Sequence, residues 1–103
     1  MSEFTKVVDA KDLPSGKSVC VEFGGEKVAL FNVDGTFYAV SDTCTHAGGP
    51  LSQGEVDGTV VTCPLHGATF DLTTGSVTGP PAGSAVTCYQ VRVEGDGIQI
   101  AAP

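Results

Sequence analysis

Three Asp-Gly pairs divide this chain into short runs of strand-forming residues. The pairs are Asp34-Gly35, Asp57-Gly58 and Asp96-Gly97. Each stands between runs rich in Val, Ile, Phe, Tyr and Thr, such as KVALFNV before the first pair and TFYAV after it. Asp-Gly between two such runs is typical of a tight β-hairpin turn. We therefore predict an all-β fold of antiparallel hairpins, either a sandwich or a small barrel.

Composition changes along the chain. Residues from about 43 to 81 are denser in Gly, Pro, Thr, Cys and His than the segments on either side, which look more like strands. Only residues 6–13, KVVDAKDL, suggest a helical turn. A chain of 103 residues is long enough for one domain. We predict a single domain, residues 1–103, with a base of about 1–42 and 82–103 and an inserted subdomain of about 43–81.

The N-terminal residues MSEFTKVVDAKDL carry charge from the third position onward and include no apolar run of the kind found in signal peptides. No later stretch is apolar over the roughly 18 residues that a membrane span needs. We therefore expect a cytoplasmic protein that does not contact a membrane. In that compartment, the four cysteines favour metal ligation over a disulfide framework.

The net charge of −7 is unevenly distributed, because no Lys or Arg lies between Lys27 and Arg92. Five acidic residues fall in that interval: Asp34, Asp42, Glu55, Asp57 and Asp71. Such a surface argues against nucleic acid and anionic membranes as partners. It either docks a partner through a basic patch or simply keeps the protein soluble.

Both histidines of the chain follow a cysteine closely. Cys44 and His46 are two residues apart, Cys63 and His66 are three apart, and Gly or Ala-Gly comes directly after each pair. These glycines favour loops. The sixteen residues between His46 and Cys63 contain the hairpin predicted at Asp57-Gly58. Such a hairpin would bring the two loops side by side, so two Cys and two His would converge.

Four such ligands suit either a tetrahedral zinc site or an iron–sulfur cluster. Zinc fingers usually pair cysteine with cysteine and histidine with histidine along the chain, whereas each loop here carries one of each. A mixed pair per loop favours a two-iron cluster, in which two thiolates hold one iron and two imidazoles hold the other. A zinc-stabilised interaction module is the alternative.

The pattern C-x-H, then sixteen residues, then C-x-x-H resembles the ligand signature of Rieske-type [2Fe–2S] proteins. The resemblance extends to Gly48, Pro64, Gly67, the pair Phe70-Asp71, and residues 74–82. This last segment, TGSVTGPPA, is similar to the glycine and proline loop that shields the cluster in that family. The resemblance implies a Rieske-type fold, in which a small cluster-binding subdomain is inserted into an antiparallel β base.

The same resemblance implies one [2Fe–2S] cluster per chain and assigns its ligands. By that resemblance, Cys44 and Cys63 bind one iron, and His46 and His66 bind the other. The quinol-oxidising branch of the family carries a disulfide between two extra loop cysteines, where this chain has Gly49 and Leu65. No loop disulfide is therefore expected here.

That branch also carries a serine and a tyrosine where this chain has Ala68 and Phe70. Their hydroxyls hydrogen-bond to the sulfurs and stabilise the reduced state. Without these hydroxyls, we expect a midpoint potential toward the low end of the Rieske range of about −150 to +300 mV.

The resemblance implies a soluble one-electron carrier, similar to the ferredoxin components of bacterial dioxygenase systems in aromatic hydrocarbon catabolism. It would not be an enzyme. It would take electrons from a flavin-containing reductase and pass them to a terminal ring-hydroxylating oxygenase with its own Rieske centre. No G-x-G-x-x-G motif follows a strand, and a mononuclear iron site would need two histidines beyond the two already assigned.

A small Rieske-like subunit of another oxidoreductase complex, such as assimilatory nitrite reductase, is the alternative. Such subunits often lack the ligands that are intact here.

Cys20 and Cys88 lie in strand-like runs, VCV and TCY. We expect both to be ordinary, mostly buried free thiols. A disulfide between them stays open at this stage.

Overall fold

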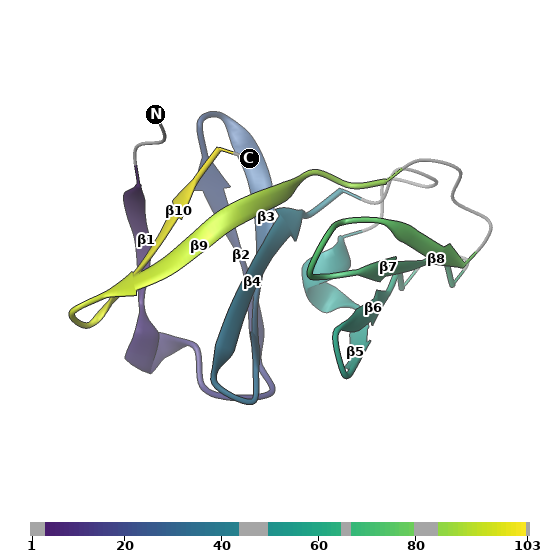
Figure 1. Ribbon diagram of the computed structural model, residues 1–103, viewed down its shortest axis with the longest axis horizontal. Coiled ribbons are helices and arrows are strands. Elements are labelled where there is room, and N and C mark those ends of the chain that lie inside the picture. The colour runs from purple at the N-terminus through teal and green to yellow at the C-terminus, as the bar shows by residue number, and fades with distance from the viewer. Residues whose placement is uncertain (1–3, 44–49, 65–66, 80–84, 103) are drawn as a thin grey trace.

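A computed structural model describes residues 4–43, 50–64, 67–79 and 85–102 (Figure 1). Six strands form the larger sheet, in the order β1-β10-β9-β4-β3-β2. Their bounds are β1 (Thr5–Asp9), β2 (Ser18–Phe23), β3 (Glu26–Val33), β4 (Thr36–Ser41), β9 (Cys88–Glu94) and β10 (Gly97–Ala101). The two edge strands, β1 and β2, approach each other, so this sheet forms a nearly closed barrel.

The smaller sheet has four strands in the order β5-β6-β7-β8 and lies beside one side of the larger sheet (Figure 1). Its strands are β5 (Glu55–Asp57), β6 (Val60–Thr62), β7 (Thr69–Asp71) and β8 (Val77–Gly79). Two short 3₁₀ helices complete the described elements: η1 (Ala10–Asp12) and η2 (Leu51–Gln53). Every pairing between the described strands is antiparallel, which confirms the predicted all-β fold.

The three predicted hairpins are present, with one difference in detail. Asp34 and Gly35 form the β3–β4 turn themselves, with φ values of 52° and 91°. Positive φ at both central residues is the conformation that a type I′ hairpin requires. In the other two hairpins the reversal begins at Gly58 and Gly95, so Asp57 ends β5 and Gly97 begins β10. The helical turn suggested for residues 6–13 is reduced to the three residues of η1.

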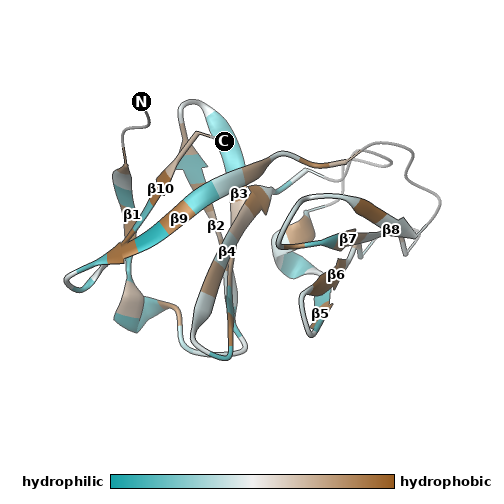
Figure 2. Ribbon diagram, in the orientation of Figure 1, coloured by the Kyte–Doolittle hydropathy of each residue, from teal (hydrophilic) through white to brown (hydrophobic). Residues whose placement is uncertain are grey.

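Apolar residues are packed into two cores, and Figure 2 shows the hydrophobic positions on the strands of both sheets. The base core lies inside the larger sheet and consists of Leu13, Val28, Leu30, Ala39, Ile98 and Ile100. The junction core lies between the two sheets. It consists of Ala29, Phe31, Val40, Leu51, Val61, Cys63, Ala68, Phe70, Leu72 and Val86.

Strand β3 contributes to both cores, because successive side chains of a strand point to opposite faces. Val28 and Leu30 enter the base core, whereas Ala29 and Phe31 enter the junction core. The nearly continuous apolar run of this strand is explained by this burial on both faces. The smaller sheet is thereby anchored on the larger one.

Cys20 and Cys88 are free thiols, so the disulfide left open by the sequence is not formed. Cys20 pairs with Ala29, Ala29 with Val40, and Val40 with Cys88, so two strands separate the cysteines. Three strand spacings amount to about 14 Å, about twice the Cα separation that a disulfide can bridge. Cys20 is exposed, contrary to the expected burial, because β2 is an edge strand.

Within the described part of the chain, no helix has the length and apolar character needed to cross a membrane.

Candidate metal centre

Of the four predicted ligands, Cys63 lies within the described residues, and Cys44, His46 and His66 lie outside them. Gly48, Gly49, Leu65 and residues 80–82, which were compared with the Rieske family, also lie outside. Cys63 directly follows β6, and its side chain is only 1% exposed. Across the described residues, no three His, Cys, Asp or Glu side chains gather at one point. The complete ligand set therefore stays a prediction.

The segment that holds Cys44 and His46 is closed at its base by described residues. Thr43 and Pro50 form an antiparallel bridge across it. Just outside that bridge, the Leu51 amide donates a hydrogen bond to the Asp42 carbonyl at 2.7 Å. The two ends of this segment are therefore held together, as expected for a ligand loop.

The segment that holds His66 is closed in the same way. Thr62 and Thr69 pair between β6 and β7, and the Cys63 amide donates to the Ala68 carbonyl at 2.7 Å. Gly67 has φ of 78°, in the left-handed region that favours glycine. The two ends of this segment are therefore held together as well.

The bases of the two segments are in contact with each other. Leu51, at the end of the first, is fully buried in the junction core together with Cys63 and Ala68 of the second. Gly54 lies directly against the backbone of Thr62, since a Cβ atom at Gly54 would overlap the Thr62 carbonyl oxygen. The β5–β6 hairpin thus returns the chain as predicted and brings the two bases together.

A third contact lies where the chain leaves β8 and returns to the larger sheet. The Val86 amide donates to the Gly75 carbonyl at 2.9 Å, and Gly75 has φ of 82°. This contact joins the two ends of the segment that contains Pro80 and Pro81. The shielding role assigned to those prolines stays a prediction.

The two carboxylates nearest to the predicted ligands in sequence have different surroundings. Asp71 is a turn residue, because its Oδ1 accepts hydrogen bonds from the Thr73 amide at 2.8 Å and the Thr73 hydroxyl at 2.6 Å. These bonds hold the pKa of Asp71 below its ordinary value. Asp42 is buried, with 5% exposure, and its Oδ1 accepts from the Ser52 amide at 2.8 Å.

The surroundings of Cys63 fit a metal-bound thiolate. Val61, Ala68 and Phe70 share its core, and each is fully buried. A bare thiolate is disfavoured in an apolar environment, but a bound metal ion stabilises it. Ala68 and Phe70 bring no hydroxyl into this core, whereas the quinol-oxidising branch of the resembled family carries a serine and a tyrosine at these two positions.

Two residues that matter for this arrangement carried no strong sequence signal. Gly54 is one of 14 glycines, and nothing in its neighbourhood marks it as the point of closest backbone approach. Asp42 entered the sequence analysis only as one of five acidic residues, and its bond to Ser52 depends on tertiary structure.

Comparisons with known proteins support the same reading. The family model described as Rieske [2Fe–2S] domain matches residues 3–90. The chain is 41% identical over 98 residues to the biphenyl dioxygenase ferredoxin subunit of Pseudomonas sp. strain KKS102, which covers 94% of this chain and 90% of that protein.

Solved structures show the same fold. The ferredoxin of carbazole 1,9a-dioxygenase from Nocardioides aromaticivorans IC177 superposes with a TM-score of 0.91 at 29% identity, covering 97% of this chain and 98% of that one. One chain of a complex of reduced oxygenase and oxidized ferredoxin in carbazole 1,9a-dioxygenase gives a TM-score of 0.88 at 34% identity, covering 95% of this chain and 92% of that one.

A putative NADH-dependent nitrite reductase small subunit from Mycobacterium tuberculosis also superposes, with a TM-score of 0.89 at 31% identity. It covers 100% of this chain and 97% of that one.

The family match extends over most of the chain, and a curated relative exceeds 40% identity across nearly its full length. The resemblance drawn from the Cys-His spacing is therefore confirmed, and the cofactor is a Rieske-type [2Fe–2S] cluster. The chain belongs to the Rieske [2Fe–2S] domain family.

Proposed function

We propose that this protein is a Rieske-type ferredoxin. It is a one-electron carrier that accepts electrons from a flavin-containing reductase and delivers them to the terminal oxygenase of a ring-hydroxylating dioxygenase system. The observation that carries the proposal is the match to a dioxygenase ferredoxin subunit over 90% of that relative's length. The complex of oxygenase and ferredoxin in the carbazole system supports an oxygenase as electron acceptor.

Within residues of about 43–81, Cys44 and Cys63 bind one iron, and His46 and His66 bind the other. When bound, such a cluster takes up and releases a single electron. The protein's own contribution is to hold the two ligand segments together. It does so through the Thr43–Pro50 bridge, the pairing of Thr62 with Thr69, and the shared junction core.

The carrier works in the cytoplasm. Cys20 and Cys88 are free thiols, as is usual in a reducing compartment. The chain acts as an electron-transfer component and catalyses no reaction on an organic substrate by itself.

The test of this function begins with iron and sulfide assays and low-temperature EPR of the purified protein, before and after dithionite. About two irons and two sulfides per chain are expected, with a rhombic signal of low average g after reduction. The reduced protein is then mixed anaerobically with the oxidised terminal oxygenase of a biphenyl dioxygenase. Rapid reoxidation is expected, whereas a colourless zinc protein would contradict the proposal.

A second candidate is the small subunit of a nitrite reductase, which is favoured by the superposition on the Mycobacterium tuberculosis structure. Stable co-purification with a large reductase subunit would support this candidate. A monomeric carrier that exchanges electrons with the oxygenase would exclude it.

Phe70→Tyr is expected to raise the midpoint potential by about 20–60 mV, since a hydrogen bond to the reduced centre stabilises that state by roughly 0.5–1.5 kcal/mol. Phe70 is fully buried in the core that contains Cys63, so an added hydroxyl enters that core. Film voltammetry of both proteins measures the difference. Phe70→Leu, which disturbs packing without adding a hydroxyl, is the matched control, and an unchanged or lowered value for the tyrosine variant would refute the argument.

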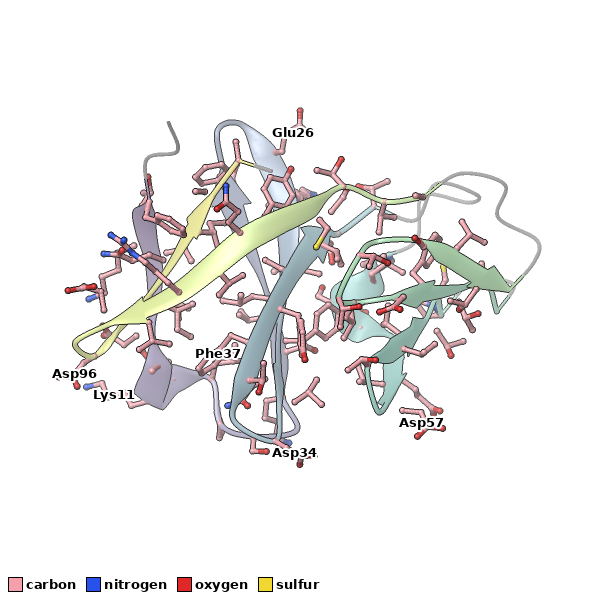
Figure 3. The ribbon with its side chains drawn as sticks, viewed as in Figure 1. Lys11, Glu26, Asp34, Phe37, Asp57 and Asp96 are labelled. Atoms are coloured by element: carbon pink, nitrogen blue, oxygen red, sulfur yellow. The ribbon has the colours of Figure 1, made fainter. Side chains whose placement is uncertain are left out.

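The basic residues are confined to one part of the molecule. Figure 3 shows Lys11, together with Asp96, near the end of the long axis opposite to the smaller sheet that carries Asp57. All five Lys and Arg residues precede residue 28 or follow residue 91, so the smaller sheet contains none. Glu55 and Asp57 are exposed on its edge strand β5. An acidic end of this kind steers encounter with a basic partner surface.

Association with the oxygenase is therefore expected to slow severalfold between about 20 and 200 mM salt, because screening shortens the reach of these charges. Stopped-flow electron transfer under encounter-limited conditions measures the rate. Replacing Glu55 and Asp57 by Gln and Asn should weaken the salt dependence. Replacing both Glu22 and Glu26 by Gln, at the β2–β3 hairpin, removes the same number of charges away from β5 and serves as the control; equal effects at the two places would contradict this docking surface.

A further inference from the structure

Asp42 connects the larger sheet with the segment that follows the first pair of predicted ligands. Its amide donates to the Lys27 carbonyl of β3 at 3.0 Å, and its carbonyl accepts from the Leu51 amide at 2.7 Å. Its side chain, 5% exposed, accepts from the Ser52 amide at 2.8 Å. The amide of Asp42 therefore binds β3, whereas its carbonyl and its carboxylate both bind η2.

Ser52 is held from two directions. Its amide donates to the Asp42 carboxylate, and its carbonyl accepts a hydrogen bond from the Ser18 hydroxyl of β2 at 2.5 Å. Hydrogen bonds to an ionised acceptor are roughly twice as strong as those between neutral groups. The bond to the Asp42 carboxylate is accordingly the stronger of the two hydrogen bonds that hold Ser52.

The position of η2 matters because of its neighbour Leu51. This residue is fully buried in the junction core with Cys63 and Ala68. Movement of η2 would therefore shift the end of the first ligand segment relative to the second. The hydrogen bonds within η2 run from the Gln53 amide to the Pro50 carbonyl and from the Gly54 amide to the Leu51 carbonyl. They do not attach η2 to the larger sheet, so they do not prevent such a shift.

The Cys20 thiol also lies within reach of the same carboxylate. Partial desolvation of its sulfur raises the pKa of this largely exposed thiol, and the charge of Asp42 and a hydrogen bond to it add to the effect. This bond joins Cys20 to Asp42. Replacing Cys20 by Ala therefore alters the surroundings of the Asp42 carboxylate and leaves its hydrogen bond to the Ser52 amide in place.

We propose that Asp42 is a positioning residue for the iron–sulfur cluster. Its carboxylate fixes η2 through Ser52, and η2 in turn sets the segment carrying Cys44 and His46 against the segment carrying Cys63 and His66. The inference rests on the proposed function, because the residues that Asp42 positions are the proposed ligands.

The experiment compares Asp42→Ala, Asp42→Asn and Cys20→Ala with the wild-type holoprotein. EPR of the reduced proteins reports the geometry at the cluster, and transfer of iron to a chelator reports how firmly it is held. Asp42→Ala should change the g values and release iron about tenfold faster, as expected for loss of one charge-assisted hydrogen bond. Asp42→Asn keeps an oxygen acceptor for the Ser52 amide but loses the charge, so it should fall between wild type and Asp42→Ala, whereas Cys20→Ala should behave like wild type.

Wild-type g values and iron release in Asp42→Ala would overturn the inference. It would also be overturned if Asp42→Asn behaved like the alanine variant, because charge and not the bond to Ser52 would then be responsible. Failure of the proposed function is distinct, since the wild-type protein would then lack the two-iron cluster altogether.

A second measurement covers the case in which Asp42→Ala does not fold. In the structure, the amides of residues 51–54 all donate hydrogen bonds. Hydrogen exchange of the wild-type holoprotein, resolved to single residues, should therefore show four protected amides. Free exchange of the Ser52 amide, with the other three protected, would refute the role of Asp42.

Discussion

Gly54→Ala is expected to assemble almost no iron–sulfur cluster while keeping the larger sheet folded. The added methyl group would overlap the Thr62 carbonyl oxygen and lie 3.2 Å from the Leu51 carbonyl oxygen. Both are backbone atoms, which cannot rotate out of the way. Gly54 has φ of −79°, which alanine adopts freely, so the effect is purely steric. Relief requires η2 and β6 to separate, and these two elements support the two ligand segments.

Iron and sulfide per chain, together with circular dichroism, measure this outcome. Because the overlap is with a backbone atom, we expect a cost near the upper end of the usual range of about 1–3 kcal/mol, which corresponds to roughly a hundredfold loss of iron. Gly97→Ala is the matched control: its Cβ would lie 3.0 to 3.2 Å from carbons of the flexible Lys6 side chain in the larger sheet. Full iron content in Gly54→Ala would show that cluster assembly does not depend on the close approach of Gly54 to the Thr62 backbone.

His46→Cys is expected to keep two irons and to lower the midpoint potential by about 100–150 mV, roughly half of the gap between the low end of the Rieske range and four-thiolate clusters. A thiolate carries a negative charge where a neutral imidazole carries none, so reduction of the cluster becomes less favourable. Clusters with four thiolates have potentials near about −400 mV, and the variant, with three thiolates and one imidazole, should fall between that value and the Rieske range. Voltammetry and the absorption spectrum measure the change on one sample.

The control for this variant is Thr5→Cys, which adds an exposed thiol to β1, in the larger sheet. It should leave both the spectrum and the potential unchanged. An unaltered chromophore in His46→Cys would contradict the assignment of His46 as an iron ligand. Complete loss of iron from the variant would mean that the segment cannot accept a thiolate at this position.

Local features of the sequence predicted much of this fold. The Asp-Gly pairs identified three hairpins, because the turn geometry they favour depends on only two residues. At Asp34-Gly35 even the turn residues were correct, and at the other two pairs the reversal was displaced by one residue. The Cys-His spacing likewise identified the family, since both ligand pairs are local patterns.

Contacts between distant segments could not be predicted in the same way. Exposure of Cys20 depends on β2 being an edge strand, and VCV reads equally well as a central strand. The approach of Gly54 to Thr62 and the bond from Ser52 to Asp42 depend on how the two sheets pack. Of the predicted ligands, the structure describes Cys63 alone, so the convergence of all four stays a prediction.

The participation of β3 in two cores has a consequence for how the protein loses its structure. Ala29 and Phe31 belong to the larger sheet by chain position but supply part of the apolar interior on which the smaller sheet rests. The smaller sheet therefore has no interior of its own that would survive excision. The two sheets should therefore unfold in one cooperative transition. For the same reason, the subdomain of about residues 43–81 should not fold by itself without β3 and β4.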